Sequence, residues 1–294
     1  MLKGFCMGAA DVVPGVSGGT MAFILGIYET LIHAIKSFDM IFVNFLFSLK
    51  IKKAFEHTNL KFLIPLGTGI LAAIFTLAKM ISWLLDNHPV PLWSFFFGLI
   101  LASIITVSKQ FHQYAVSTPF FVLSGAAITY ILIGITPAAT PDTPLFLFLS
   151  GAIAICAMIL PGISGSFILV LLGKYQYVLA AVSNRDLYVL LIFTSGVGVG
   201  ILAFAHLLNW LFKRYHDATI ALLTGLMIGS LRKIWPWKET TSCLSDTHQT
   251  VMQPLDINFI PDLWSTEVTT ALCLCIAGFF VVFILDFLAK KTTV

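Results

Sequence analysis

The chain has 294 residues, of which 58% are hydrophobic and only 11% are charged, and its formal net charge is +3. A water-soluble domain of this length cannot bury so much apolar surface, and the small net charge argues against a nucleic-acid partner. The composition therefore predicts an all-α integral membrane protein that crosses the bilayer several times.

The first element in the chain is an apolar segment that contains its own helix breakers. It reads MGAADVVPGVSGGTMAFILGIYE over residues 7–29. Pro14 stops the incoming helix, and Ser17 stands where the N-cap of an outgoing helix belongs. Because lipid offers no hydrogen bonds, a break at membrane depth must be buried in protein or line a wet cavity. We expect a re-entrant hairpin over about residues 4–34, which enters and leaves on the same side.

Two carboxylates accompany this segment. Asp11 precedes the break, and Glu29 follows Gly18, Ala22 and Gly26 at spacings of three and four, which places it on the packed face of the outgoing helix. Acids inside a membrane are costly and functional by default, and burial disfavours their charged form. We expect Asp11 and Glu29 to couple transport to a proton, with sodium as the alternative ion. The other interpretation is that Asp11 caps a helix and Glu29 snorkels to the surface.

Three apolar spans follow each broken segment, and a span needs roughly 20 apolar residues. The expected spans are Phe62–Leu85, Leu92–Val107 and Phe120–Ile135, then Tyr188–Phe212, Ile220–Leu231 and Val268–Leu288. The shorter ones need neighbouring helices or flanking residues to complete a crossing.

The second broken segment repeats the first, because Pro14 recurs as Pro161, 147 residues later. The likeness continues at a shorter offset, so the first half carries an insertion near Lys50–Lys61. The matched pairs are Gly4 with Gly151, Pro14–Gly18 with Pro161–Gly165, Leu25–Tyr28 with Leu172–Tyr175, Leu66–Gly69 with Ser195–Gly198, and Phe97–Leu99 with Thr224–Leu226. We predict two repeats, residues 1–144 and residues 145–294, the second with its own re-entrant hairpin over about residues 145–183.

Each repeat would cross the membrane about three times, and an odd number of crossings inverts the second repeat relative to the first. With re-entrant hairpins, eleven basic residues fall on one side and four on the other; if the broken segments cross fully, the split is ten to five. The eleven are Lys3, Lys36, Lys50, Lys52, Lys53, Lys61, Lys109, Lys213, Arg214, Lys290 and Lys291, and the four are Arg185, Arg232, Lys233 and Lys238. The positive-inside rule then places both termini in the cytoplasm.

A helix that begins inside the membrane offers unpaired N–H groups at the positive end of its dipole, and glycine keeps side chains from covering them. Two such helix ends, brought together by an inverted repeat, can bind an anion. The predicted phosphate site consists of Ser17, Gly18, Gly19, Thr20, Ser164, Gly165, Ser166 and Arg232. The alternatives are that the breaks are structural kinks and that Arg232 is an interfacial anchor beside Trp235 and Trp237. Lys79 and Lys174 are further candidate cations.

No motif for enzymatic chemistry is present. The sequence lacks a HExxH pair, a GxSxG elbow and a phosphate-binding loop of the nucleotide-hydrolase type. We therefore expect no catalytic residue, no metal site and no cofactor. A lipid phosphatase would need a nucleophile or a histidine pair with clustered basic residues, and the sequence lacks these.

The paired motifs carry a family resemblance. MGAADVVPGVSGGTMAFILGIYE, LPGISGSFILVLLGKY and GLMIGSLRKIWPW resemble the bacterial polyprenyl-phosphate (undecaprenyl phosphate) transporter family, formerly a family of unknown function, over nearly the whole chain. The resemblance implies a multi-pass protein of the bacterial cytoplasmic membrane that returns the carrier monophosphate for synthesis of envelope polymers such as peptidoglycan. It points to Asp11, Glu29 and Arg232, together with the stretches Pro14–Thr20 and Pro161–Ser166.

Other functions remain open on the sequence. The main alternative is a small-anion or ion-coupled solute transporter that uses the same broken helices, and a channel is a third. A site open sideways to lipid would favour the lipid carrier. The coupling ion, the direction of transport, the lipid chain length and any homo-oligomer are not determined by the residues.

Overall fold

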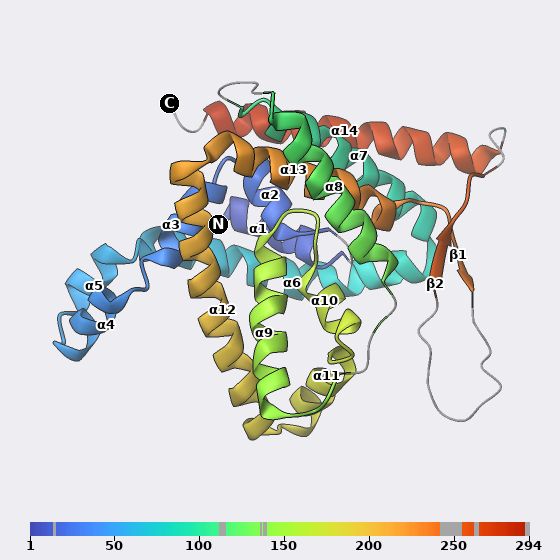
Figure 1. Ribbon diagram of the computed structural model, residues 1–294. Helices are drawn as coiled ribbons and strands as arrows, with labels where there is room; N and C mark the ends of the chain where they lie inside the picture. The colour runs from blue at the N-terminus through green and yellow to red at the C-terminus, as the bar shows by residue number, and fades with distance from the viewer. Residues whose placement is uncertain are drawn as a thin grey trace.

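The computed structural model describes residues 1–13, 16–111, 116–135, 137, 140–241, 255–261 and 265–291 (Figure 1). Pro14 and Gly15 at the centre of the first break, Cys243 and the remainder of 242–254 lie outside the described residues. The described part of the chain is mainly helical, as the sequence predicts, with one two-stranded ribbon.

In its described residues, the first half contains five short helices followed by three longer ones. Its elements are α1 (Leu2–Asp11), α2 (Gly18–Ile24), α3 (Tyr28–Lys36), α4 (Met40–Phe47), α5 (Ile51–His57), α6 (Leu60–Asn87), α7 (Pro89–Ser108) and α8 (Thr118–Gly134). The second half follows the same order without counterparts of α4 and α5. Its elements are α9 (Pro144–Ile159), α10 (Gly165–Leu171), α11 (Tyr175–Asn184), α12 (Leu187–Arg214), α13 (His216–Ile234), β1 (Lys238–Thr241), β2 (Leu255–Asn258) and α14 (Thr266–Lys291).

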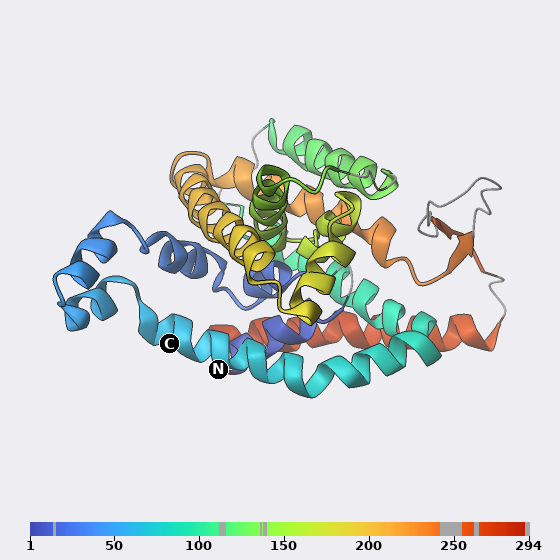
Figure 2. The same cartoon turned by 90° about the horizontal axis from the view of Figure 1, so that it is seen from below.

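All six expected spans correspond to helices. Four of them, α6, α7, α12 and α14, are long and apolar enough to cross a membrane by themselves, and the bent pairs α2–α3 and α10–α11 would make six if each is one span. Helix α8 is shorter, and α13 lies largely inside the bundle (Figures 1 and 2). The antiparallel strands β1 and β2, with Lys238 opposite Asn258, were not expected from the sequence.

Both outgoing helices end earlier than predicted. Helix α2 ends at Ile24 and meets α3 at 118°, and α10 meets α11 at 107°. Gly26 and Gly173 have φ angles of +63° and +65°. The N–H of Gly26 bonds to the Phe23 carbonyl at 3.0 Å, and the N–H of Ile27 bonds to the Ala22 carbonyl at 2.9 Å, which is a Schellman ending. The prediction of one outgoing helix that continues through Glu29 is wrong, because Gly26 ends the helix.

Glycines set the contacts between the long helices in both halves. Gly4 on α1 and Gly69 on α6 lie against the backbone of each other's helix, as do Gly151 on α9 and Gly196 on α12. A Cβ at Gly67 would meet nothing within 4 Å. Gly69, and not Gly67, therefore corresponds to Gly196, and the register expected for this stretch was shifted by two residues.

The last helices of each half pack on helices of the other half. Gly98 on α7 and Gly278 on α14 face each other's backbone, and Gly225 on α13 and Gly125 on α8 do the same. Small residues allow membrane helices to approach this closely. Gly98 and Gly225 are 127 residues apart in the sequence, and so are Gly69 and Gly196. The change of offset from 147 to 127 falls where α4 and α5 stand.

Candidate functional site

The two broken segments meet inside the bundle. The hydroxyl of Ser17 lies 3.1 Å from the carbonyl oxygens of both Met158 and Leu160, and the Tyr28 hydroxyl donates to Ile159 at 3.2 Å. These carbonyls lack helical partners because α9 ends at Ile159. Side chains of the first break thus satisfy the backbone of the second.

A fourth bond runs through the side chain of Thr20. Its hydroxyl oxygen accepts the N–H of Gly162 at 3.2 Å, and Thr20 is fully buried. Gly162 has a φ angle of +85° and packs against Ser230 of α13, so a side chain there would be strained. The two breaks therefore meet in the structure, as predicted, but their polar groups bond to one another.

The amide groups at the start of α2 are already used. The Asp11 carboxylate accepts the N–H of Gly18 at 2.7 Å, and the Ser17 hydroxyl accepts the N–H of Gly19 at 3.1 Å. The N–H of Thr20 bonds to the Ser17 carbonyl at 2.9 Å, and all four residues from Ser17 to Thr20 are buried. In this conformation a phosphate cannot reach these donors, and Asp11 acts as a helix cap, which was the second interpretation of that residue.

The start of α10 is open by comparison. Ser164 does not cap the helix, and its hydroxyl lies 2.7 Å from that of Ser166 at an exposed position. Met158 stands where the first half has Asp11, so no carboxylate covers this end. Within the described residues, the amides of Gly165 and Ser166 have no hydrogen-bond partner. These are the donors of the predicted site that lack a partner in the described part of the chain; Ser166 is exposed, whereas Gly165 is buried.

A small pocket lies beside this open end and includes a cation that the sequence analysis did not select. Its lining residues are Thr129, Leu132, Ile133, Gly162, Ile163, Ser164, Phe167 and Lys233. The Lys233 ammonium lies 5.6 Å from the centre of the Phe167 ring. Leu226 and Ser230, which face Gly162, precede Lys233 by seven and three residues, so they share its face of α13. The spacing of Lys233 from Leu226 and Ser230 was the sequence signal that could have identified this lysine.

Arg232 contacts a different part of the bundle. Its Nη1 donates to the Tyr130 carbonyl at 2.9 Å, and its guanidinium lies 4.3 Å from the Tyr130 ring centre. It also fills the space beside Gly134 on α8. No hydrogen bond joins Arg232 to either break among the residues that the structure describes. The structure therefore does not place it with the other predicted phosphate ligands.

Glu29 lies at the start of α3 and not on the packed face of α2. Its carboxylate is 3.2 Å from His216 Nε2, and its side chain is 59% exposed. It lines a polar cleft of about 420 Å³ together with His33, Asn209 and Lys213. The predicted buried position is wrong, because the turn at Gly26 directs the chain out of the bundle.

The other two candidate cations are also accounted for. Lys174 is 1% exposed, donates to the Thr140 carbonyl at 2.7 Å and forms an ion pair with Asp142. It therefore ties the α8–α9 connection to the turn between α10 and α11. Lys79 is exposed on α6, where a long side chain can reach the membrane surface.

Long apolar helices around two helix breaks that bond to each other define a multi-pass membrane protein. Residues 7–252 match the family described as undecaprenyl phosphate translocase-like, and the chain belongs to this family. The family is one of transporters and not of enzymes.

Two relatives match this chain over similar lengths. A polyprenyl-phosphate transporter of Vibrio cholerae serotype O1 (strain ATCC 39315 / El Tor Inaba N16961) is 52% identical over 241 residues, which cover 82% of this chain and 78% of the relative. A polyprenyl-phosphate transporter of Staphylococcus aureus (strain NCTC 8325 / PS 47) is 32% identical over 254 residues, covering 80% and 85%. No solved structure matches the chain.

Proposed function

We propose that this protein moves a polyprenyl phosphate, such as undecaprenyl phosphate, across the bacterial cytoplasmic membrane and so returns the carrier for synthesis of envelope polymers. The observation that carries the proposal is the second break, where the amides of Gly165 and Ser166 have no hydrogen-bond partner among the described residues and lie beside the pocket that Ser164 and Lys233 line. The names of both relatives support the same substrate class. The isoprenoid tail would remain in lipid while the headgroup occupies the site.

The first break has a different part in this proposal. Ser17 and Thr20 hold the second break in place through their bonds to residues 158–162, and the amides of Gly18 and Gly19 are occupied by Asp11 and Ser17. They would become phosphate ligands only after those bonds open. Arg232, stacked on Tyr130, would be a ligand in another conformation or an anchor near the pocket.

We further propose that the halves, residues 1–144 and 145–294, are inverted repeats with re-entrant hairpins and that both termini face the cytoplasm. The recurring glycine contacts of α1–α6 and α9–α12 support the duplication. The excess of basic residues on one side supports the orientation. Cysteine-accessibility labelling that placed Lys3 and Lys36 on opposite sides would contradict it.

Ion coupling is the last part of the proposal. Asp11 is partly buried and bonded to Gly18, whereas Glu29 is exposed, faces a cleft and pairs with His216. A proton that travels inward could offset the headgroup charge, whose movement the membrane potential opposes by roughly 2.3 kcal/mol per charge per 100 mV. Because Asp11 is the more buried of the two, Asp11→Asn is the variant expected to lose dependence on a pH gradient. If both Asp11→Asn and Glu29→Gln respond to the gradient as the wild type does, sodium coupling or simple facilitated movement is the better account.

The test of function uses purified protein in liposomes loaded with polyprenyl monophosphate on both leaflets. An impermeant phosphatase added outside hydrolyses only outward-facing headgroups, so complete hydrolysis reports movement between leaflets. We expect complete hydrolysis with the protein and about half without it, the random distribution of a lipid over two leaflets. Uptake of inorganic phosphate without movement of the lipid would instead support a small-anion transporter.

A further inference from the structure

Helices α4 and α5 form a hairpin, here called the arm (residues 39–59), that has no counterpart in the second half. In Figure 1 it projects from the body at the left. Among the described residues, its main contacts are of α4 with α5 and of α5 with the start of α6. In the described part of the chain, no helix that borders either break packs on the arm, so the proposed site does not account for it.

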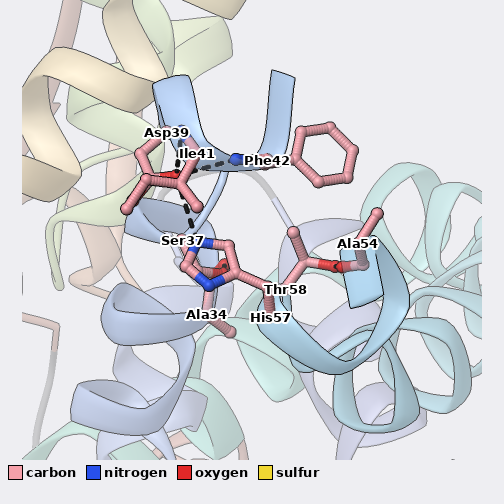
Figure 3. A network of polar contacts seen from close by, with 8 residues as sticks. All are labelled: Ala34, Ser37, Asp39, Ile41, Phe42, Ala54, His57 and Thr58. Carbon is pink, nitrogen blue, oxygen red and sulfur yellow. Dashed lines mark hydrogen bonds and ion pairs between the residues drawn. The ribbon is translucent and has the colours of Figure 1, made fainter. Parts of the chain in front are cut away.

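A polar clasp holds the arm in shape (Figure 3). Asp39 Oδ1 accepts the N–H groups of Ile41 at 2.9 Å and Phe42 at 3.0 Å, and it lies 3.0 Å from His57 Nε2. Burial alone would raise the pKa of Asp39, but the bonds from Phe42, His57 and Ile41 lower it below its usual value. The carboxylate is therefore charged at neutral pH, and it joins the first turn of α4 to the last turn of α5.

The arm exposes large apolar side chains at its tip. Phe47 is 85% exposed and Leu49 is 82% exposed. Leu49 also has a φ angle of +54°, at a helix end where glycine is the usual residue. A strained, exposed leucine gains nothing in water, whereas it gains transfer free energy if it enters lipid.

Helix α5 begins beside the tip of the arm and carries positive charge there. Lys50, Lys52 and Lys53 are exposed, and Glu56 is the only acid in α5. Only Thr58 and Asn59 separate α5 from α6, a helix long enough to cross the membrane. Lys53 precedes Leu60, the first residue of α6, by seven residues, and Lys50 precedes it by ten. Because α5 is only about 10 Å long at about 1.5 Å per residue, the lysines remain close to that end of α6.

We propose that the arm lies in the headgroup layer of the membrane and binds anionic phospholipid, with Phe47 and Leu49 among the acyl chains and Lys50, Lys52 and Lys53 on the phosphates. Apolar residues beside a basic cluster are the signature of interfacial helices that prefer anionic lipid. This inference goes beyond the proposed function, because it depends neither on the transported molecule nor on which leaflet faces the arm.

The experiment measures the depth of the arm tip in the membrane. The five native cysteines are replaced, Phe47→Cys carries a nitroxide label, and the full-length protein is reconstituted in phosphatidylcholine vesicles with or without phosphatidylglycerol. With phosphatidylglycerol, we expect dissolved oxygen to relax the label more than a water-soluble nickel chelate does. Replacing all three lysines with glutamine should shift the label toward water, by roughly fivefold in its lipid-seated population per lysine.

Glu56→Gln is the matched control, because it removes a negative charge from the same helix and should shift the label further into lipid. Retained lipid transport in the same vesicles shows that each variant is folded. Equal access of the nickel chelate in both vesicle types would overturn the proposal and favour a water-soluble partner on the arm. A label that stays in lipid regardless of phosphatidylglycerol or the lysines would also overturn it, because the arm would then be an apolar anchor without headgroup recognition.

Discussion

The two broken segments share the sequence Pro-Gly-x-Ser-Gly but have different chemistry in the structure. In the first, Asp11 and Ser17 occupy the amides of Gly18 and Gly19. In the second, Met158 replaces the carboxylate, and Gly165 has an amide without a partner in the described part of the chain. The first break thus supports the second through hydrogen bonds, whereas the second break is the one to which we assign phosphate binding.

The strongest test of this comparison is to make the second break resemble the first. Met158→Asp should place a carboxylate near the amide of Gly165, where it would cap α10 and repel phosphate. Like-charge juxtaposition costs several kcal/mol, so we expect transport to fall by at least about a hundredfold. Lipid transport in the phosphatase assay measures it, with Met158→Asn as the uncharged control. Normal transport by Met158→Asp would mean that phosphate does not bind at the start of α10.

The next test separates the two neighbouring cations on α13. Lys233→Gln should weaken binding of polyprenyl phosphate by about 1.5–3 kcal/mol, the usual contribution of a hydrogen bond to a charged group. Arg232→Gln should have a smaller effect, because Arg232 is held by Tyr130. Binding is measured by titrating the lipid into detergent-solubilised protein. The reverse order of effects would return Arg232 to the phosphate site and remove Lys233 from it.

A third test compares how tightly the two breaks are packed. A Cβ at Gly19 would collide with the carbonyl of Ile159, whereas one at Gly165 would meet the carbonyl of Ala154 at 2.7 Å. We expect Gly19→Ala to lower the free energy of unfolding by about 1–3 kcal/mol, the cost of overpacking, and Gly165→Ala to cost less. Thermal unfolding in detergent provides the measurement. Gly67→Ala, which meets nothing within 4 Å, is the control and should leave stability nearly unchanged.

The smallest effect is expected at Glu29, the acid that the turn at Gly26 carries away from the break. Its pair with His216 is exposed, so Glu29→Gln should lower the free energy of unfolding by less than about 1 kcal/mol. Asp11→Asn should cost more, because its short bond from the amide of Gly18 is partly buried and involves a charged acceptor. Denaturant titration of both variants in one detergent gives the comparison. Equal losses would show that burial does not distinguish the two carboxylates.

Much of the helical arrangement could be predicted because it depends on local composition. Apolar length identifies the spans, and Pro161 with Gly162 identifies the second break, since neither residue continues a helix in lipid. The turn at Gly26 was missed because a glycine in a helical pattern can either pack against a neighbour or end the helix. Only the backbone angle decides between these two outcomes.

The details of the site could not be predicted for a different reason. Whether Arg232 or Lys233 faces the second break depends on the rotation of α13, and one residue of rotation is about 100°. That rotation is set by packing of Gly225 and Gly229 against α8, which is remote in sequence. The hydrogen bonds of Ser17 and Thr20 with residues 158–162 likewise join parts of the chain that are more than 140 residues apart.

The last two helices of the first half pack on the last two helices of the second half, and this affects how the protein folds during synthesis. Helix α7 packs on α14, and α8 packs on α13, through glycines that leave no room for a side chain. During synthesis α7 and α8 enter the membrane long before their partners exist, because chains are made from the N-terminus. Their glycine faces must therefore stay in contact with lipid, or with the insertion machinery, until the second half arrives. The first half cannot complete its own packing. A chain that stops after α12 would leave the glycine faces of α7 and α8 without α14 and α13.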